Sequence, residues 1–256
     1  MRVDGLRRAV RGARAYSRTV LPLTLGRLPE FLVIGGPRCG TTSLYRYLAA
    51  HPSVRPATGK ELQFFSLHHR RGERWYRAHF PVRPLSQASF EASPYYLFDP
   101  ATPARAAAML PSSRFVALVR DPAERAYSHY LHSVAHGVEP LSFAGALDAE
   151  PARLAAGDHT ALRQFSYVAR GRYAEQLTRW FDAVGRDRVL VVRTEELTSR
   201  YADILAFLGL EPQAVPAERH TRRATGAPPL DDALRARLDA EFADDQKALA
   251  DLLAPD

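Results

Sequence analysis

The sequence has a single cysteine and no long uninterrupted run of apolar residues. Cys39 is the only cysteine among 256 residues, which excludes an internal disulfide and a zinc site built on cysteines. Because so little cysteine is compatible with a reducing compartment, we predict a cytoplasmic protein. No stretch approaches the ~18 consecutive apolar residues that cross a bilayer, and the N-terminus lacks the apolar core of a secretion signal. The sequence therefore predicts no transmembrane segment.

The charge of the chain is unbalanced. Lys and Arg number 35 against 28 Asp and Glu, which gives a formal net charge of +7 and a pI near 9.8. Such a charge suits a polyanionic ligand or an acidic partner. No motif or basic-aromatic repeat typical of nucleic-acid binding accompanies it, so we predict no nucleic-acid partner.

We predict one domain over residues 30–256, preceded by a basic N-terminal extension over residues 1–29. With 46% hydrophobic residues, the chain can bury one sizeable core. The extension can contact an anionic membrane surface peripherally or lie as a solvated arm on the domain, and the sequence leaves both open. Its arginines are Arg2, Arg7, Arg8, Arg11, Arg14, Arg18 and Arg27.

A glycine-rich loop separates a short apolar run from a helix pattern. Residues 31–34 are apolar and predict a buried strand, whereas Leu44 and Leu48 recur at helical spacing. Between them, Gly35 and Gly40 permit backbone conformations in which successive amides face one anion at the positive end of the helix. This arrangement predicts a phosphate-binding loop, and the alternative is a glycine-containing turn that binds nothing.

The loop departs from the GxxxxGK[ST] pattern of nucleoside triphosphatases. Gly35 and Gly40 have the right spacing, but Thr41 stands where the lysine is expected, so no side chain there reaches a γ-phosphate. The positive charge lies inside the loop, at Arg38. This placement favours a nucleotide with a short 5′ group over ATP.

Strands alternate with helices along the rest of the chain. Residues 115–119 and 189–192 predict two further buried strands, each preceded by a helical or loop segment. Asp121 and Pro122 are typical of a helix N-cap and first turn, and residues from 231 onward carry leucines at the spacing of a terminal helix. We predict an α/β fold, a single domain with a central parallel sheet flanked by helices.

A second anion subsite is predicted where the strand at 115–119 ends. Arg120 follows that strand, and Ser128 and His132 share one side of the next helix, so Arg120 and Ser128 can bind a phosphate together. The alternative is that Arg120 pairs with a nearby carboxylate, Asp121 or Glu124. His129, His132 and His136 have helical spacings that could suit a metal, but no carboxylate or cysteine completes the set, so we predict no metal.

The segments GPRCGTTSLYRYLAAHP, KELQFF, EASPYYLF and VRDPAERAYSHYLH resemble, in this order, the sulfotransferase family that uses 3′-phosphoadenosine 5′-phosphosulfate (PAPS). The similarity is greatest to the heparan-sulfate-type branch and its soluble bacterial relatives. It implies a P-loop-kinase-like sulfotransferase fold, PAPS as co-substrate and no metal.

The resemblance also implies roles for individual residues. Glu61 would be the base that deprotonates the acceptor, Arg38 would stabilise charge on the departing phosphate, and His132 would assist the base or orient the acceptor. Some relatives carry a lysine where this chain has Ala92, so one cation is missing. The residues implied to bind the co-substrate are Arg38, Cys39, Gly40, Thr41, Thr42 and Ser43 at the 5′-phosphosulfate, Arg120 and Ser128 at the 3′-phosphate, and Arg222 and Arg223 in a weakly matched loop.

The predicted function is sulfuryl transfer to a hydroxyl or amine of a small-molecule or glycan acceptor: a carbohydrate, glycolipid or secondary metabolite. A kinase of the same general fold is the alternative enzyme, disfavoured by Thr41. A non-catalytic nucleotide-binding module that keeps Arg38, Arg120 and Ser128 but does not use Glu61 is the alternative of another class.

Overall fold

Five parallel strands form the central sheet of the protein. The computed structural model describes residues 26–82, 84–216 and 228–254. The strands are β1 (Phe31–Val33), β2 (Val54–Pro56), β3 (Ala88–Ala92), β4 (Arg114–Val119) and β5 (Val189–Arg193), in the spatial order β2-β3-β1-β4-β5. The predicted parallel α/β fold is confirmed, and β2 and β3 are two strands that the sequence analysis did not predict.

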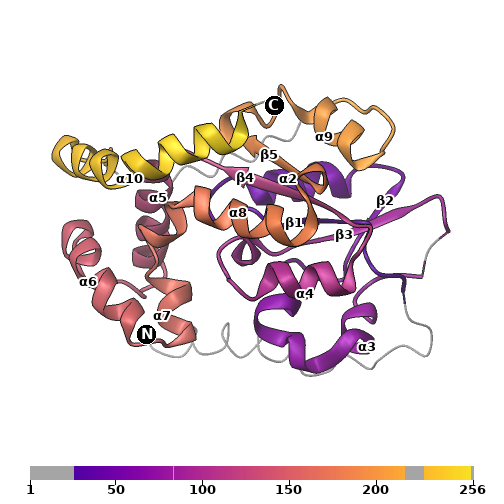
Figure 1. The fold of residues 1–256 in the computed structure, drawn as a ribbon, viewed down its shortest axis with the longest axis horizontal. Helices are drawn as coiled ribbons and strands as arrows, with labels where there is room; N and C mark the ends of the chain where they lie inside the picture. Colours follow the sequence, from indigo (N-terminus) through magenta and orange to yellow (C-terminus); the bar gives the residue numbers. More distant parts are fainter. Residues whose placement is uncertain (1–25, 83, 217–227, 255–256) are drawn as a thin grey trace, which may run out of the picture.

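Helices cover both faces of the sheet (Figure 1). On one face, α4 (Thr102–Met109) packs against α8 (Tyr173–Val184), and the ring of Trp180 lies 5.0 Å from that of Phe115 in β4. On the other, α2 (Thr41–Ala49) meets α9 (Tyr201–Leu208) through the rings of Tyr47 and Tyr201, whose centroids are 5.6 Å apart. The strands are therefore buried on both sides, as all-parallel sheets are.

Three further helices gather at one end of the molecule, on the left of Figure 1. They are α5 (Pro122–Ala135), α6 (Phe143–Ala155) and α7 (His159–Gln164). Together with the terminal helix α10 (Asp232–Leu253) they enclose a second, smaller core around Phe143, Tyr167 and Phe242. This end carries α5, the helix predicted to hold the second anion subsite.

The predicted start of α5 is confirmed. The Asp121 carboxylate accepts a hydrogen bond from the Glu124 backbone N–H at 2.8 Å, and Pro122 occupies the first turn. Asp121 also pairs with Arg235 of α10 at 2.8 Å, which ties the terminal helix to the end of β4.

The aromatic segment between residues 60 and 80 folds into short helices: η1 (Phe64–His68), η2 (His69–Arg71) and α3 (Gly72–Arg77). Phe64, Phe65 and Tyr76 are buried, and the rings of Phe64 and Tyr76 stack 4.4 Å apart. These rings therefore pack in the core and are not exposed to a ligand. The remaining short helices are η3 (Pro94–Tyr96), η4 (Ala169–Gly171), η5 (Arg186–Arg188) and η6 (Thr194–Glu196).

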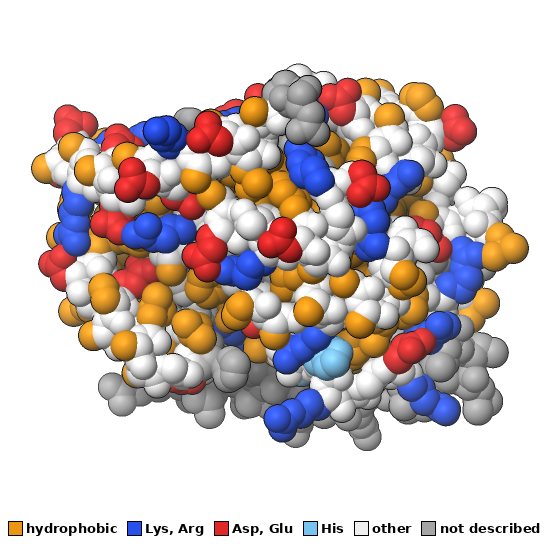
Figure 2. Space-filling model, viewed as in Figure 1, with side chains coloured by type: hydrophobic (Ala, Val, Ile, Leu, Met, Phe, Trp, Pro, Cys, Tyr) orange, Lys and Arg blue, Asp and Glu red, His pale blue; other side chains and the backbone are white. Residues whose placement is uncertain are grey.

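Residues 26–29 of the predicted extension already pack on the domain, since Arg27 donates a hydrogen bond to the Gln87 carbonyl at 3.1 Å. Residues 1–25 lie outside the described part of the chain. On the face drawn in Figure 2, Lys and Arg side chains are interspersed with Asp and Glu. Within the described ranges, no helix combines the length and apolarity that crossing a membrane requires.

Candidate functional site

The glycine-rich loop joins β1 to α2 at the carboxyl edge of the sheet. A Cβ on Gly35 would lie 2.0 Å from the Leu118 amide nitrogen, so the loop approaches β4 as only glycine permits. Arg38 and Gly40 have φ values of 70° and 81°, which turn the chain into the N-terminus of α2. The loop thus presents the positive end of a helix next to the end of β4.

A pocket of about 160 Å³ opens at the loop. It is lined by Arg38, Gly40, Thr41, Thr42, Ser43, Arg46, Arg120 and Ser128. The structure therefore brings together seven residues predicted to bind the co-substrate, from two segments about 80 residues apart. Arg46 was not predicted: it lies four residues after Thr42, one helical turn along α2, and this spacing was the available signal.

Contacts of two arginines fix the walls of this pocket. The Arg38 Nε donates to the Ser128 Oγ at 3.1 Å, which links the loop to α5. Arg120 lines the same pocket and pairs with Glu124 at 3.2 Å. The carboxylate pairing considered for Arg120 is therefore present, and it leaves the guanidinium at the pocket, where phosphate binding by Arg120 stays a prediction.

Cys39 differs from the other loop residues. Its thiol is fully buried, 3.6 Å from the Tyr173 hydroxyl, and burial raises the pKa of the thiol. Its backbone N–H donates to the Gly36 carbonyl at 3.1 Å. The structure gives Cys39 a place in the core, so we remove it from the proposed ligand set.

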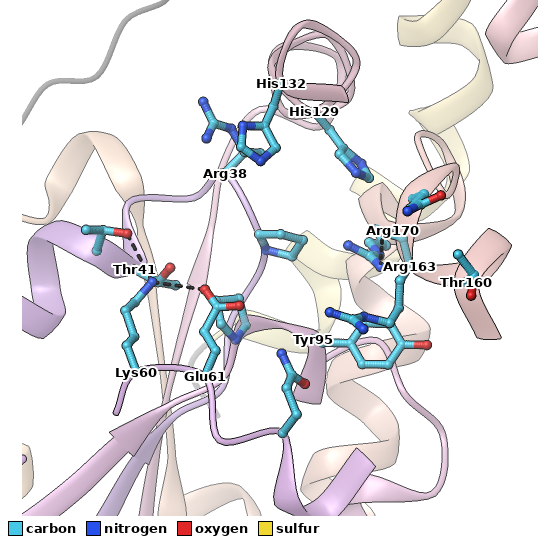
Figure 3. Close-up of a pocket in the computed structure, with 15 residues that line it drawn as sticks. Arg38, Thr41, Lys60, Glu61, Tyr95, His129, His132, Thr160, Arg163 and Arg170 are labelled. Atoms are coloured by element: carbon cyan, nitrogen blue, oxygen red, sulfur yellow. Dashed lines mark hydrogen bonds and ion pairs between the residues drawn. The ribbon is translucent and has the colours of Figure 1, made fainter. Parts of the chain in front are cut away.

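A larger cavity of about 520 Å³ adjoins the loop (Figure 3). Its walls come from the loop, the segment before η1, the start of η3, helices α5 and α7, and η4. The residues lining it are Pro37, Arg38, Thr41, Thr42, Lys60, Glu61, Gln63, Pro94, Tyr95, His129, His132, Thr160, Arg163, Gln164 and Arg170. All three side chains predicted to be catalytic, Glu61, Arg38 and His132, border this one cavity.

Lys60 and Glu61 form the wall nearest the loop. The Lys60 Nζ donates to the Thr42 Oγ1 and to the Glu61 Oε1, each at 3.1 Å. Glu61 is partly exposed to the cavity, and its backbone has a φ of 62°, with 54° at Gln63. Such conformations cost about 1–3 kcal/mol each outside glycine, and they persist where surrounding structure enforces them.

A buried carboxylate beneath this segment enforces them. Glu91 on β3 is fully buried and accepts hydrogen bonds from the hydroxyls of Tyr76 and Tyr96, each at 2.8 Å. Ser93 donates to Glu91 at 2.9 Å and accepts from the Gln63 backbone N–H at 3.1 Å. Burial raises the pKa of the Glu91 carboxyl from 4.5 to about 7, against the lowering effect of these hydrogen bonds. The sequence analysis missed Glu91, although it is the first residue of the EASPYYLF segment.

Two of the three histidines considered for a metal lie on α5, and the third, His136, is its C-cap. The rings of His132 and His136 lie 4.1 Å apart, and His136 Nδ1 contacts the His132 carbonyl oxygen at 2.8 Å. His129 is buried against Tyr167, and its pKa is lowered well below 6.5 by burial and by Arg170. No cluster of three potential metal ligands occurs in the part of the chain that the structure describes.

Arg222 and Arg223, predicted to bind the nucleotide, lie outside the described residues.

Comparison with known proteins settles the family. A family model described as "Sulfotransferase domain" matches residues 28–225, most of the chain. The chain belongs to the sulfotransferase family. This sulfotransferase is 34% identical over 205 residues to the human bifunctional heparan sulfate N-deacetylase/N-sulfotransferase 2, an alignment covering 74% of the chain and 23% of that relative. A Caenorhabditis elegans relative of the same description, numbered 1, is 30% identical over 71% of the chain and 22% of its own length. The chain thus spans less than a quarter of these curated relatives.

Solved structures agree with the family assignment. A sulfotransferase from Alicyclobacillus acidocaldarius is 31% identical, with a TM-score of 0.78 over 90% of this chain and 97% of that chain. A mouse sulfotransferase complexed with PAP, 14% identical, has a TM-score of 0.52 over 89% of this chain and 88% of its own, which shows the shared fold. The comparisons confirm the predicted fold and identify the protein as a sulfotransferase enzyme.

Proposed function

We propose that this sulfotransferase moves a sulfuryl group from PAPS to a hydroxyl or amine of a carbohydrate, glycolipid or secondary-metabolite acceptor. The observation that carries the proposal is the position of Glu61, Lys60 and Arg38 on one cavity that adjoins the pocket at the glycine-rich loop. The first pocket suits the phosphates of the donor. The second, at about 520 Å³, falls within the usual size of small-molecule sites.

The donor would be held by charge and by the helix end. Thr41, Thr42 and Ser43 begin α2, where backbone amides and the helix dipole favour the 5′-phosphosulfate. Arg120 and Ser128 would bind the 3′-phosphate, and Arg46 adds a third side chain to the same pocket. A guanidinium and a phosphate form paired, charge-assisted hydrogen bonds, which gives the site its preference for a 3′-phosphorylated nucleotide.

In the transfer step, Glu61 would take the proton from the acceptor as its oxygen or nitrogen attacks sulfur. One bond forms between the acceptor atom and sulfur, and the bond between sulfur and the 5′-phosphate oxygen breaks, leaving 3′-phosphoadenosine 5′-phosphate (PAP). Arg38 stays protonated, so it would stabilise the charge on the departing oxygen without donating a proton. His132, on the opposite wall, would orient the acceptor.

Lys60 would supply the cation that is missing at Ala92. Ala92 is fully buried and its carbonyl accepts a hydrogen bond from the Glu61 N–H at 3.0 Å, so β3 would position the base but would contribute no cation. The Lys60 Nζ instead reaches the Thr42 hydroxyl at the start of α2. A cation there is close enough to the loop to stabilise charge that develops on the transferring group.

Turnover of Glu61→Gln tests this proposal. Purified enzyme is incubated with sulfur-labelled PAPS and a panel of sugar, amino-sugar and phenolic acceptors, and labelled product is separated from donor. We expect wild-type turnover with at least one acceptor and a loss of roughly 100-fold or more in Glu61→Gln, with unchanged affinity for PAP. Full activity of Glu61→Gln would remove Glu61 as base, whereas PAP binding without turnover of any acceptor would favour a non-catalytic binding module.

A further inference from the structure

The end of the 520 Å³ cavity farthest from the glycine-rich loop carries two arginines to which the proposed function gives no role. Figure 3 shows Arg163, Arg170 and Thr160 on the side of the cavity opposite Thr41 and Lys60. The charged side chains lining the whole cavity are Arg38, Lys60, Arg163, Arg170 and Glu61. Cations therefore outnumber carboxylates four to one, and the single carboxylate lies next to the loop.

Arg170 is a buried cation held in a fixed position. Its guanidinium lies 4.9 Å from the ring of Tyr95 and 5.3 Å from that of Phe98, and its Nη2 donates to the carbonyls of Leu162 and Arg163 at 3.0 and 2.9 Å. The side chain is 95% removed from solvent, since only 5% of the residue is exposed. Among the described residues, its Nε has no hydrogen-bond partner.

A second buried cation, Arg125, lies near Arg170. Burial, and next the positive charge of Arg125, lower the pKa of Arg170 from 12.5 to about 9. Arg125 is itself fully buried, and its Nε and Nη1 have no partner among the described residues. The charge of Glu150 opposes this lowering, but the Glu150 oxygens accept hydrogen bonds from the backbone of Val168 and Ala169.

His129 contributes a neutral donor to the same wall. Its ring packs against Tyr167, and its Nδ1 is buried without a partner among the described residues. Burial and the two neighbouring arginines lower its pKa, so the imidazole is neutral at physiological pH. A neutral imidazole carries one N–H that can donate to an anion.

Buried cations and donors without partners are costly to the folded protein, and such costs are retained where a ligand offsets them. The phosphates and sulfate of the donor cannot do so here, because the proposed donor site lies at the loop on the other side of the cavity. We infer that Arg163, Arg170 and His129 form a subsite for an acidic group, a carboxylate or a sulfate, carried by the acceptor. The inference rests on the proposed function and narrows its acceptors to acidic molecules, with the acidic group at this end and the accepting hydroxyl or amine near Glu61.

A purely structural role for Arg170 is the competing explanation. The guanidinium caps the last carbonyls of α7 and stacks on two aromatic rings, which would stabilise the fold without any ligand. Arg163 separates the two explanations, because its side chain is exposed and lines the cavity. Its substitution leaves the cap on α7 intact, since only the Arg163 backbone carbonyl takes part in it.

The test compares two glycosides that differ in one group. p-Nitrophenyl β-D-glucuronide and p-nitrophenyl β-D-glucoside are titrated by ligand-observed NMR into enzyme saturated with PAP, so that the donor site is filled. Because a carboxylate would form charge-assisted hydrogen bonds at this end of the cavity, we expect the glucuronide to bind at least about tenfold more tightly. In Arg163→Gln and Arg170→Lys the preference should fall to about threefold or less, with glucoside affinity unchanged. Lys247→Gln, which removes an exposed cation on α10, is the matched control and should keep the preference.

Two results with the glycosides would overturn the subsite. One is equal affinity of wild type for both glycosides, including no measurable binding of either, and the other is a preference retained by both arginine variants. Inorganic sulfate is the third arm: displacement of the glucuronide by equimolar sulfate would identify a site for free anions and would contradict an acceptor subsite. PAP affinity is measured in the same samples, so failure of the donor site, which would remove the proposed function, is distinguishable from failure of this subsite.

Discussion

The buried carboxyl of Glu91 makes stability depend on pH in a direction opposite to that of an ion-paired carboxylate. Its pKa is 4.5 in an exposed chain and about 7 in the folded protein. The folded state therefore binds the proton more tightly than the unfolded state, and stability decreases as pH rises from 4.5 to about 7. Integrating over the window from about pH 5 to about pH 8 gives a loss of about 2–3 kcal/mol from this one group.

Glu91→Gln removes that dependence. The amide keeps the shape and the oxygen that accepts from Tyr76 and Tyr96, but it does not titrate. Urea unfolding of both proteins is followed by the fluorescence of Trp75 and Trp180, of which Trp180 is fully buried, in steps across this pH window. We expect the difference in free energy of unfolding, wild type minus variant, to fall by about 2–3 kcal/mol from the acidic to the basic end.

The control is Glu73→Gln, which removes an exposed carboxylate paired with Arg77 on α3. This variant should follow the wild-type pH profile. If the wild-type and Glu91→Gln profiles run parallel across the window, the carboxyl does not titrate there and the reasoning about its burial is refuted.

Three further substitutions test the loop and its surroundings. Gly35→Ala places a Cβ 2.0 Å from the Leu118 amide nitrogen, so it should lower the free energy of unfolding in urea by about 3 kcal/mol. The control is Gly59→Ala, whose Cβ has its nearest contact at 3.8 Å and which should change that free energy by less than about 0.5 kcal/mol. Lys60→Met should lower kcat by about 100-fold with a smaller effect on PAP affinity, and Lys60→Arg should keep part of the wild-type kcat. Equal activity of Lys60→Met and wild type would contradict a role for this cation. Arg46→Ala should weaken PAP binding by about tenfold in calorimetry, and an unchanged Kd would place Arg46 outside the donor site.

Local sequence signals were sufficient for the elements that carry them. The strand, loop and helix around Gly35 and Gly40 follow from glycine spacing, and the start of α5 follows from Asp121 and Pro122. In each case the residues that define the structure are adjacent in the chain, so their pattern is visible without knowledge of the fold.

β2 and β3 were missed because their patterns are weak. β2 has three residues and ends in Pro56, which is tolerated because the strand lies at the edge of the sheet. β3 includes Ser89 and Glu91, and polar residues do not suggest a strand that is buried on both faces.

The missed site residues depend on contacts between distant segments. Glu91 is held by Tyr76, which is 15 residues away, and Arg170 is buried through Tyr95 and Phe98, more than 70 residues away. Lys60 is recognised as a candidate site residue only because its Nζ contacts the Thr42 hydroxyl. No periodicity or spacing in the sequence predicts such contacts, because the order of the strands in the sheet brings these segments together.

The most direct test of the donor site is calorimetric titration of the purified protein with PAP, in parallel with ATP and 5′-AMP. We expect tight binding of PAP that requires the 3′-phosphate and weakens by about tenfold or more in both Arg120→Ala and Ser128→Ala. Binding of PAP no tighter than that of ATP would contradict a PAPS site and would favour a kinase-like use of the same loop.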